Sequence, residues 1–263
     1  MFELKGRRRR RLREKPLPPE WLEIIRRNVP YYRRLPEEDR RELHGHVQVF
    51  LAEKHFEGCG GLELTEEIRV TVAAHACILL LHRRTDYYPK LTSILIYPHV
   101  YVARNVKRRQ NGLVYEQDET RSGESWDRGM LVLSWEDVRR SAADINDGHN
   151  VVLHEFAHQL DQEDGEIDGA PGLPRRSRYA AWARVLGEEY ERLIRTLEQH
   201  RRDVIDDYGA TSPAEFFAVV TESFFTKPIP LKNRHPELYE QLRLFYQQDP
   251  AALERERAPE GFA

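Results

Sequence analysis

Residues 151–161 read VVLHEFAHQLD and contain the pattern His154-Glu155-x-x-His158. The stretch has no Pro or Gly, and its residue types permit a continuous helix. Positions four apart lie on one face of a helix, so the two histidines can offer ring nitrogens to one metal ion. Zinc suits such a site because it binds neutral imidazole at about 2.0–2.1 Å and prefers tetrahedral geometry. Glu155 is placed to take a proton from water at the metal.

The flanks of this pattern strengthen the metal interpretation. The pattern alone is a weak signal in a chain with 11 histidines and 44 acidic residues, because it can arise there by chance. The neighbouring residues are apolar, which predicts a buried helix: Val151, Val152, Leu153, Phe156, Ala157 and Leu160. Histidine and glutamate are costly to bury unless they have partners. A metal ion supplies such a partner, so the stretch predicts a metal site.

Two residues compete for the third ligand position. Asp164 lies six residues after the second histidine, the spacing of the elongated metzincin pattern. That pattern needs a sharp turn at a glycine three residues after the second histidine, but Asp161 stands there and Gly165 comes too late. Glu215 is in the first turn of an apolar segment at 214–226 that predicts a buried helix, and a bare carboxylate there would be costly.

Two histidines and one glutamate would leave a fourth metal position for water, as in catalytic zinc sites. We therefore favour Glu215 over Asp164. The alternative for Glu215 is a helix-start carboxylate that is favoured by the helix dipole. Asp161, Asp164 and Glu222 are the candidates for hydrogen bonding the far nitrogens of the two histidines.

Composition bounds the class of protein. The chain has 263 residues, 40% hydrophobic and 32% charged, as expected for a soluble globular protein of one large or two small domains. A net charge of −3 gives no global drive toward nucleic acid or an anionic membrane. Cys59 and Cys77 are not in a paired spacing, which fits a reducing cytoplasm. No apolar run approaches the ~20 residues of a membrane span. The N-terminus lacks an apolar signal core, so we expect a cytoplasmic location.

The N-terminus carries a basic run at residues 7–15. Such a run could be a nucleic-acid arm but is more often a solvated tail. We therefore expect residues 1–15 to be a basic mobile tail and direct nucleic-acid binding to be absent. Residues 16–263 are expected to form a single domain.

Periodicity and turn signals predict an α+β fold that is mostly helical. Helices are expected at residues 20–28, 36–56, 65–81, 134–144, 151–164, 177–200, 214–226 and 236–248. Strands are expected at residues 91–97, 100–106, 113–116 and 130–133, with a hairpin at Asn111-Gly112 and an exposed loop at 118–127. The strands would form a small mixed β-sheet upstream of the metal helix.

Several segments carry a resemblance to a known family. Residues 154–161, preceded by residues 148–153, resemble the Mlc titration factor A family of bacterial zinc peptidases. Residues 214–219 resemble the second motif of that family, and three further segments also fit, namely 88–89, 94–98 and 245–250. The likeness spans nearly all of the chain after the basic run. The family is similar in its site to the anthrax lethal factor catalytic domain, and both are glutamate-ligand zincins.

The resemblance implies a zincin-type metallopeptidase domain over residues 16–263 with one Zn²⁺ per chain. It implies His154, His158 and Glu215 as zinc ligands, Glu155 as general base, and Tyr208 as the hydroxyl that steadies the tetrahedral intermediate. From the residues alone, Tyr208 would be a packing tyrosine in a loop. The family shows aminopeptidase-type activity on small substrates, so a peptide or protein substrate is expected.

The resemblance also implies a regulatory partner. Members from enterobacteria bind the glucose repressor Mlc and so affect sugar-transport genes. The alternative to a peptidase is therefore a zinc-containing regulatory protein that sequesters a transcription factor without proteolysis. The fourth metal position separates the two hypotheses, because a structural zinc site is closed by four protein ligands.

Overall fold

The computed structural model describes residues 2–99, 101–108, 114–121, 123–126, 129–143, 148–173 and 175–256. The helices in these ranges are α1 (Phe2–Arg13), α2 (Pro19–Asn28), α3 (Glu37–Glu53), α4 (Glu66–Ile78), α5 (Trp135–Ala143), α6 (Val151–Asp161), α7 (Tyr179–Glu198), α8 (Pro213–Thr226), α9 (Pro228–Arg234), α10 (Pro236–Tyr246) and α11 (Pro250–Arg255). Short 3₁₀ helices are η1 (Pro30–Arg34), η2 (Gln162–Asp164), η3 (Arg176–Arg178) and η4 (Asp207–Ala210). The strands are β1 (His55–Gly58), β2 (Ser93–Tyr97), β3 (Tyr101–Arg108), β4 (Val114–Arg121), β5 (Gly123–Trp126) and β6 (Met130–Ser134).

Four strands form a mixed sheet in the order β1-β2-β6-β5. β1, β2 and β6 are parallel, and β5 pairs antiparallel with β6. Phe56 is opposite Ile94, and Ile94 is opposite Leu131, so one row of apolar side chains crosses the parallel strands. All three side chains are buried. β3 and β4 form a separate antiparallel pair, and the predicted hairpin at Asn111-Gly112 lies outside the described residues.

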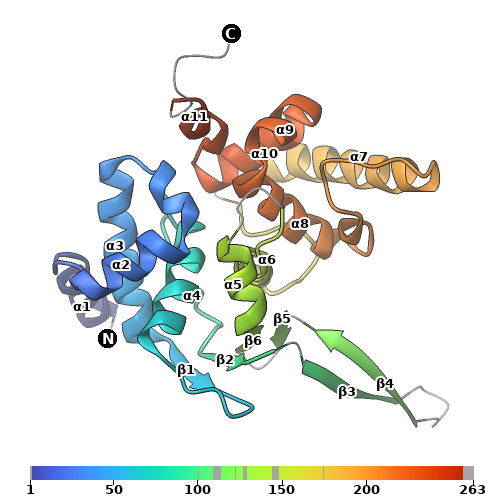
Figure 1. Ribbon diagram of the computed structural model, residues 1–263. Coiled ribbons are helices and arrows are strands. Elements are labelled where there is room, and N and C mark those ends of the chain that lie inside the picture. The colour runs from blue at the N-terminus through green and yellow to red at the C-terminus, as the bar shows by residue number, and fades with distance from the viewer. Residues whose placement is uncertain are drawn as a thin grey trace.

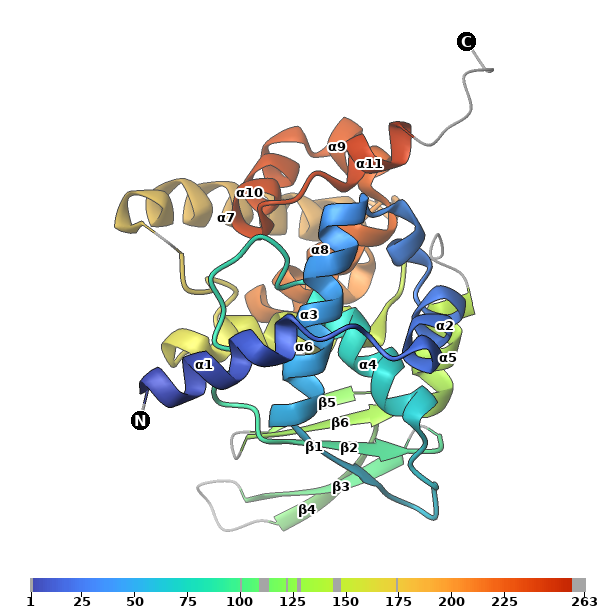
Figure 2. The ribbon, with the colours of Figure 1, turned by 90° about the vertical axis from the view of Figure 1, so that its left-hand side faces the viewer.

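Helix α6 lies in the middle of the fold, between the sheet and the C-terminal helices (Figure 1). The view in Figure 2 places α3, α4 and α6 over the same face of the sheet. Phe156 anchors α6 in this core, because its ring lies 5.7 Å from that of Phe50 and 4.8 Å from that of Tyr88, between ring centroids. The fold is thus a mostly helical α+β domain with a small mixed sheet before α6, which confirms the predicted fold class.

Local capping signals set the start of the two helices that matter most here. The Asn150 side chain accepts a hydrogen bond from the Leu153 N–H and caps α6. Ser212 accepts a hydrogen bond from the Glu215 N–H, and Pro213 occupies the first position of α8. The first turn of α8 is therefore fixed locally, and Glu215 lies in that turn.

Some elements differ from the sequence-based expectation. The region predicted as an exposed loop at 118–127 instead holds the end of β4 and strand β5. β1 was expected to be the end of a long helix, and α9 and α11 were not expected. None of the helices in the described ranges combines the length and apolar character that crossing a bilayer requires.

The basic N-terminal run forms helix α1, which packs on α3, whereas composition predicted a mobile tail. Arg9 carries this contact. Its guanidinium binds both carboxylate oxygens of Glu53, at 2.8 and 2.7 Å, and also Asp86. It lies 4.7 Å from the centre of the Tyr87 ring. Tertiary partners therefore order a segment whose own composition favours solvation.

Replacing Arg9 with Ala is expected to lower the free energy of unfolding by about 2 kcal/mol, because a charged hydrogen-bonded pair is removed and Glu53 is left unpaired. Both side chains of the pair are largely shielded, at 12% and 15% exposure. The matched control is Arg10→Ala, an exposed arginine of the same helix, with an expected change within about 0.5 kcal/mol. Urea denaturation measures both. Equal effects of the two substitutions would mean that α1 does not dock.

Candidate metal centre

Three side chains from two helices converge on one point. The Nε2 atom of His154 lies 3.0 Å from Oε2 of Glu215 and 3.3 Å from Nε2 of His158. The Nε2 atom of His158 lies 3.4 Å from the same carboxylate oxygen. α6 supplies both histidines one turn apart, and the first turn of α8 supplies the glutamate. This is the group of metal-binding residue types that the sequence analysis favoured, including Glu215.

The spacing of these atoms fits a tetrahedral ion. With bonds of about 2.0–2.1 Å, two ligands of a tetrahedral zinc are about 3.3 Å apart. The three measured separations, 3.0, 3.3 and 3.4 Å, lie around that value. Two imidazoles and one carboxylate also match the donor preference of zinc. The residues present therefore fit a zinc ion.

Glu222 of α8 holds the far side of His154. Its Oε1 lies 2.7 Å from His154 Nδ1, and its Oε2 accepts the backbone N–H of Asn150. A carboxylate at Nδ1 keeps the proton on that nitrogen and turns the lone pair of Nε2 toward the metal position. Of the three candidate outer partners, Glu222 is thus the one that hydrogen bonds a histidine in this structure.

The charges around this point favour a cation. Burial lowers the pKa of His154, but the charge of Glu222 and hydrogen bonds with Glu215 and Glu222 raise it well above its usual value. Burial raises the pKa of Glu215, but hydrogen bonds with His154 and His158 leave it far below its usual range. The carboxylates therefore stabilise positive charge between the two helices, and a metal ion can take that place.

Glu155 is buried beside the three converging side chains. Its exposed fraction is 6%. Burial raises the pKa of its carboxyl, and the charges of His154 and His158 oppose that rise. A raised pKa brings a carboxylate closer to the range in which it can take up and release a proton near neutral pH.

Tyr208 lies on the solvent side of the site in η4, just before α8. Its side chain is 53% exposed, and its ring centre is 6.0 Å from that of His154. The side chains of His154 and Glu215 are themselves 12% and 22% exposed. The site is thus accessible from the face on which Tyr208 lies.

Asp164 is not part of this group. It lies in η2 beyond the end of α6, where its carboxylate accepts the N–H of Glu166 in an exposed turn. Since α6 ends at Asp161 without the sharp turn that a metzincin site needs, its chain does not bring Asp164 back to the histidines. Of the two candidates, Glu215 is therefore the one whose carboxylate lies beside both histidine rings in this structure.

A second group with metal-binding residue types lies on α3 and after α4, formed by Asp39, Glu42 and His82. His82 Nε2 lies 3.2 Å from Asp39, and His82 Nδ1 lies 3.6 Å from Glu42. The two ring nitrogens point in different directions, so each faces a different carboxylate. This is the arrangement of a histidine that links two segments through a separate carboxylate at each ring nitrogen, and the group needs no metal.

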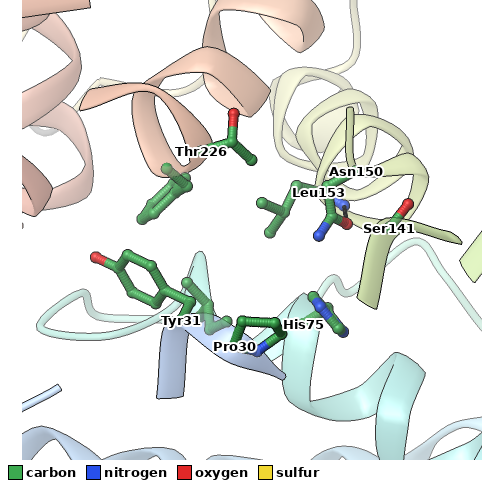
Figure 3. Close-up of a pocket in the computed structure, with 9 residues that line it drawn as sticks. Pro30, Tyr31, His75, Ser141, Asn150, Leu153 and Thr226 are labelled. Atoms are coloured by element: carbon green, nitrogen blue, oxygen red, sulfur yellow. Dashed lines mark hydrogen bonds between the residues drawn. The ribbon is translucent and has the colours of Figure 1, made fainter. Parts of the chain in front are cut away.

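A small cavity lies behind the N-terminus of α6 (Figure 3). It has room for about one water molecule. Asn150, Ser141 and His75 line it. Burial lowers the pKa of His75 to about 4, and the ring hydrogen bonds the Thr71 carbonyl, so His75 is a neutral core histidine. The cavity is too small for a peptide.

Sequence reasoning missed one member of the site. Asn150 joins the two helices, because it caps α6 and donates its backbone N–H to Glu222. The signal was present, since Asn directly before an apolar run is a typical N-cap. The hydrogen bond from the Asn150 N–H to Glu222 has no signal in the sequence, because the two residues are 72 positions apart.

Comparison with known proteins places the chain in a family. A family model described as glucose-regulated metallo-peptidase M90 matches residues 4–247. An uncharacterized protein of Synechocystis sp. is 43% identical over 244 residues, which cover 92% of this chain and 89% of that protein. Mlc titration factor A of Serratia proteamaculans is 34% identical, with 85% and 86% of the two chains covered. Mlc titration factor A of Klebsiella pneumoniae is also 34% identical, with 87% and 86% covered.

These matches extend over nearly the whole chain, and they agree with the resemblance that the two motifs carry. A metallopeptidase family implies a metal ion, and the convergence of His154, His158 and Glu215 offers a place for it. The chain therefore belongs to the glucose-regulated metallo-peptidase M90 family.

Proposed function

We propose that this protein is a zinc-dependent peptidase with His154, His158 and Glu215 as the zinc ligands. The observation that carries the proposal is the set of ligand separations, 3.0 to 3.4 Å, around a single point on the accessible side of α6. Three protein ligands leave a fourth position for water, which is the arrangement of catalytic rather than structural zinc sites.

Each neighbouring residue has a role in the proposed reaction. Zinc at this site would supply Lewis acidity, lowering the pKa of a bound water toward about 7. Glu155 accepts the proton of the attacking water and returns it to the leaving amine. Glu222 keeps the His154 ring in the orientation and tautomer that a ligand needs. Tyr208 donates a hydrogen bond from its hydroxyl to the oxyanion of the tetrahedral intermediate.

We further propose aminopeptidase-type cleavage, in line with the family resemblance. The test is a panel of short peptides with free and with acetylated N-termini, given to the zinc-loaded protein. Cleavage of only the peptides with a free N-terminus supports an aminopeptidase. Equal cleavage of the free and the acetylated peptides would indicate an endopeptidase instead. Zinc-loaded protein that cleaves neither series, nor any of a wide set of internally quenched peptides, would count against the peptidase proposal.

Tyr208→Phe is expected to lower kcat by about 10²-fold, because removal of one donor to an oxyanion costs roughly that much. KM should change little, since the lost hydrogen bond forms only as the oxyanion develops. Steady-state kinetics on the best substrate of the panel measure both constants. The control is Tyr179→Phe, which removes a hydroxyl that accepts the Leu173 N–H away from the metal ligands. A rise in KM with unchanged kcat in Tyr208→Phe would assign Tyr208 to substrate binding instead.

A second candidate is a regulatory function. Two relatives carry the name Mlc titration factor A, which supports a repressor of the Mlc type as a partner of this chain. Binding of purified Mlc repressor, measured by calorimetry with wild type and Glu155→Gln, separates the two functions. If both proteins bind the repressor and neither hydrolyses peptides, the result supports sequestration of the repressor and rejects the peptidase proposal.

A further inference from the structure

Helix α6 carries two buried polar atoms that have no hydrogen-bond partner. Within the described ranges, four buried side-chain atoms lack a partner, and two of them are His158 Nδ1 and Asp161 Oδ1. They belong to residues three apart on the same helix, so they lie on neighbouring turns of one face. Unpaired buried polar atoms are uncommon in folded proteins and call for an explanation.

The two atoms are complementary in chemistry. If Nε2 of His158 directs its lone pair at a metal, Nδ1 carries the proton and is a donor. Asp161 Oδ1 is an acceptor, and the Asp161 side chain is fully buried, at 0% exposure. Helical side chains lean toward the N-terminus, which tilts Asp161 back over the turn that contains His158.

The first histidine already has a partner of this kind. His154 Nδ1 lies 2.7 Å from a carboxylate oxygen of Glu222. Metal-binding histidines in proteins almost always donate the far N–H to a carboxylate, a carbonyl or a water. Asp161 is the carboxylate that lies next to His158 along the same helix face, so it can complete the pair of outer partners.

The other oxygen of Asp161 binds the loop at Gly169, which packs against the start of α8, the helix of the third proposed ligand. Oδ2 accepts the backbone N–H of Gly169 at 2.8 Å. Gly169 has a φ of +81°, and a Cβ there would collide with the carbonyl oxygen of Pro213, the first residue of α8. Its own carbonyl accepts the indole N–H of Trp182 at 3.0 Å. The loop at Gly169 thus packs directly against the turn that presents Glu215.

We propose that Asp161 is a positioning residue for the metal centre, with its Oδ1 accepting the Nδ1–H of His158 directly or through one water. Its Oδ2 holds Gly169 against the start of α8, so one carboxylate orients a ligand from each helix. The proposal rests on the metal site proposed above, but not on the reaction that the site performs.

The test is the affinity of the protein for zinc, which does not depend on hydrolysis. Asp161→Asn retains an oxygen for the Gly169 N–H but replaces Oδ1, the proposed acceptor for His158, with an amide NH₂ group, which cannot accept. The dissociation constant for Zn²⁺, measured on chelator-stripped protein by competition with a chromophoric chelator, is expected to rise about 10- to 100-fold. The matched control is Asp164→Asn, three residues further and exposed, with no expected change.

A third variant, Asp161→Ala, removes both contacts and should bind zinc at least as weakly as Asp161→Asn. If Asp161→Asn binds zinc as tightly as wild type and only the alanine variant is weaker, Asp161 acts through Gly169 alone and the proposal is overturned. Wild-type affinity in both variants overturns it as well. Zinc binding that follows the expected order in a protein without peptidase activity would overturn the proposed function and leave the role of Asp161 standing.

A measurement on unaltered protein covers the case in which the variants do not fold. With ¹⁵N-labelled histidine and bound zinc, the proposal expects slowly exchanging downfield Nδ1–H signals that are assigned to both His154 and His158. The buried His75 and His235 rings, whose Nδ1 atoms bond Thr71 and Glu189, add signals of their own and are assigned separately. A signal from His154 without one from His158 would overturn the proposal.

Discussion

Glu155→Gln is expected to lower kcat for peptide hydrolysis by about 10²- to 10⁴-fold, the range that a positioned general base contributes. Glutamine has nearly the same shape but cannot accept a proton from water. Glu155 is not among the three converging residues, so zinc affinity should be unchanged. Zinc content by metal analysis and kcat by steady-state kinetics are measured on the same preparation.

Loss of activity through unfolding can be separated from this effect. Burial raises the pKa of the Glu155 carboxyl, so its ionised form is disfavoured in the folded, metal-free protein. The raised pKa means that this group lowers stability as pH rises above the unfolded value, and a neutral glutamine removes that cost. The metal-free variant should therefore unfold at the same temperature as wild type or higher. The control for the assay is Glu163→Gln, a half-buried glutamate just beyond α6. Wild-type kcat in Glu155→Gln would refute its role as the base.

Glu215→Gln is expected to raise the dissociation constant for zinc by more than about 100-fold, beyond the range that loss of an outer partner causes. The carboxylate oxygen lies 3.0 and 3.4 Å from the two histidine nitrogens, and a neutral amide oxygen is a much weaker ligand for zinc. Equilibrium dialysis followed by metal analysis gives the affinity. Hydrolysis should fall in parallel, and excess zinc should restore part of it.

The matched control is Glu237→Gln, another first-turn glutamate, which lies at the exposed start of α10 and pairs with Arg184. It tests the alternative that Glu215 serves only the helix dipole, because that role would give both variants a small loss of stability and no loss of zinc. Unchanged zinc affinity in Glu215→Gln would therefore return Glu215 to the role of a helix-start carboxylate.

The helices that frame the site could be predicted because their signals are local. Ser212 and Pro213 start α8, and Thr65 caps α4, each through contacts within one turn. The apolar period of α6 likewise marks its buried face. Such signals depend only on neighbouring residues, so they can be recognised in the sequence when the rest of the fold is unknown.

The strand segments that were not predicted depend on partners far along the chain. β4 was expected only up to Glu116, because its polar second half looks like a loop until β3 pairs with it. β1 has only four residues and follows a helix directly, and its parallel partner β2 begins at Ser93. Helix α1 also depends on distant partners, because Arg9 in its arginine run forms ion pairs with Glu53 and Asp86.

Two short segments of sequence were enough to predict the residues of the proposed metal centre. The spacing of His154 and His158 puts two nitrogens on one helix face, and Glu155 between them follows from the same helix geometry. Glu215 was predicted as the third ligand because its carboxylate lies in the first turn of an otherwise apolar helix. All of these follow from local rules of helix geometry and the cost of burying charge.

Which carboxylates meet the histidines depends on how the helices pack. Glu215 and Glu222 lie 61 and 68 residues after His154, and the packing of α8 against α6 brings both to its ring. Asp161 and Asp164 are nearer in sequence, but the end of α6 directs one into the core and the other to solvent. Contacts between helices depend on crossing geometry and side-chain packing, which no local pattern encodes.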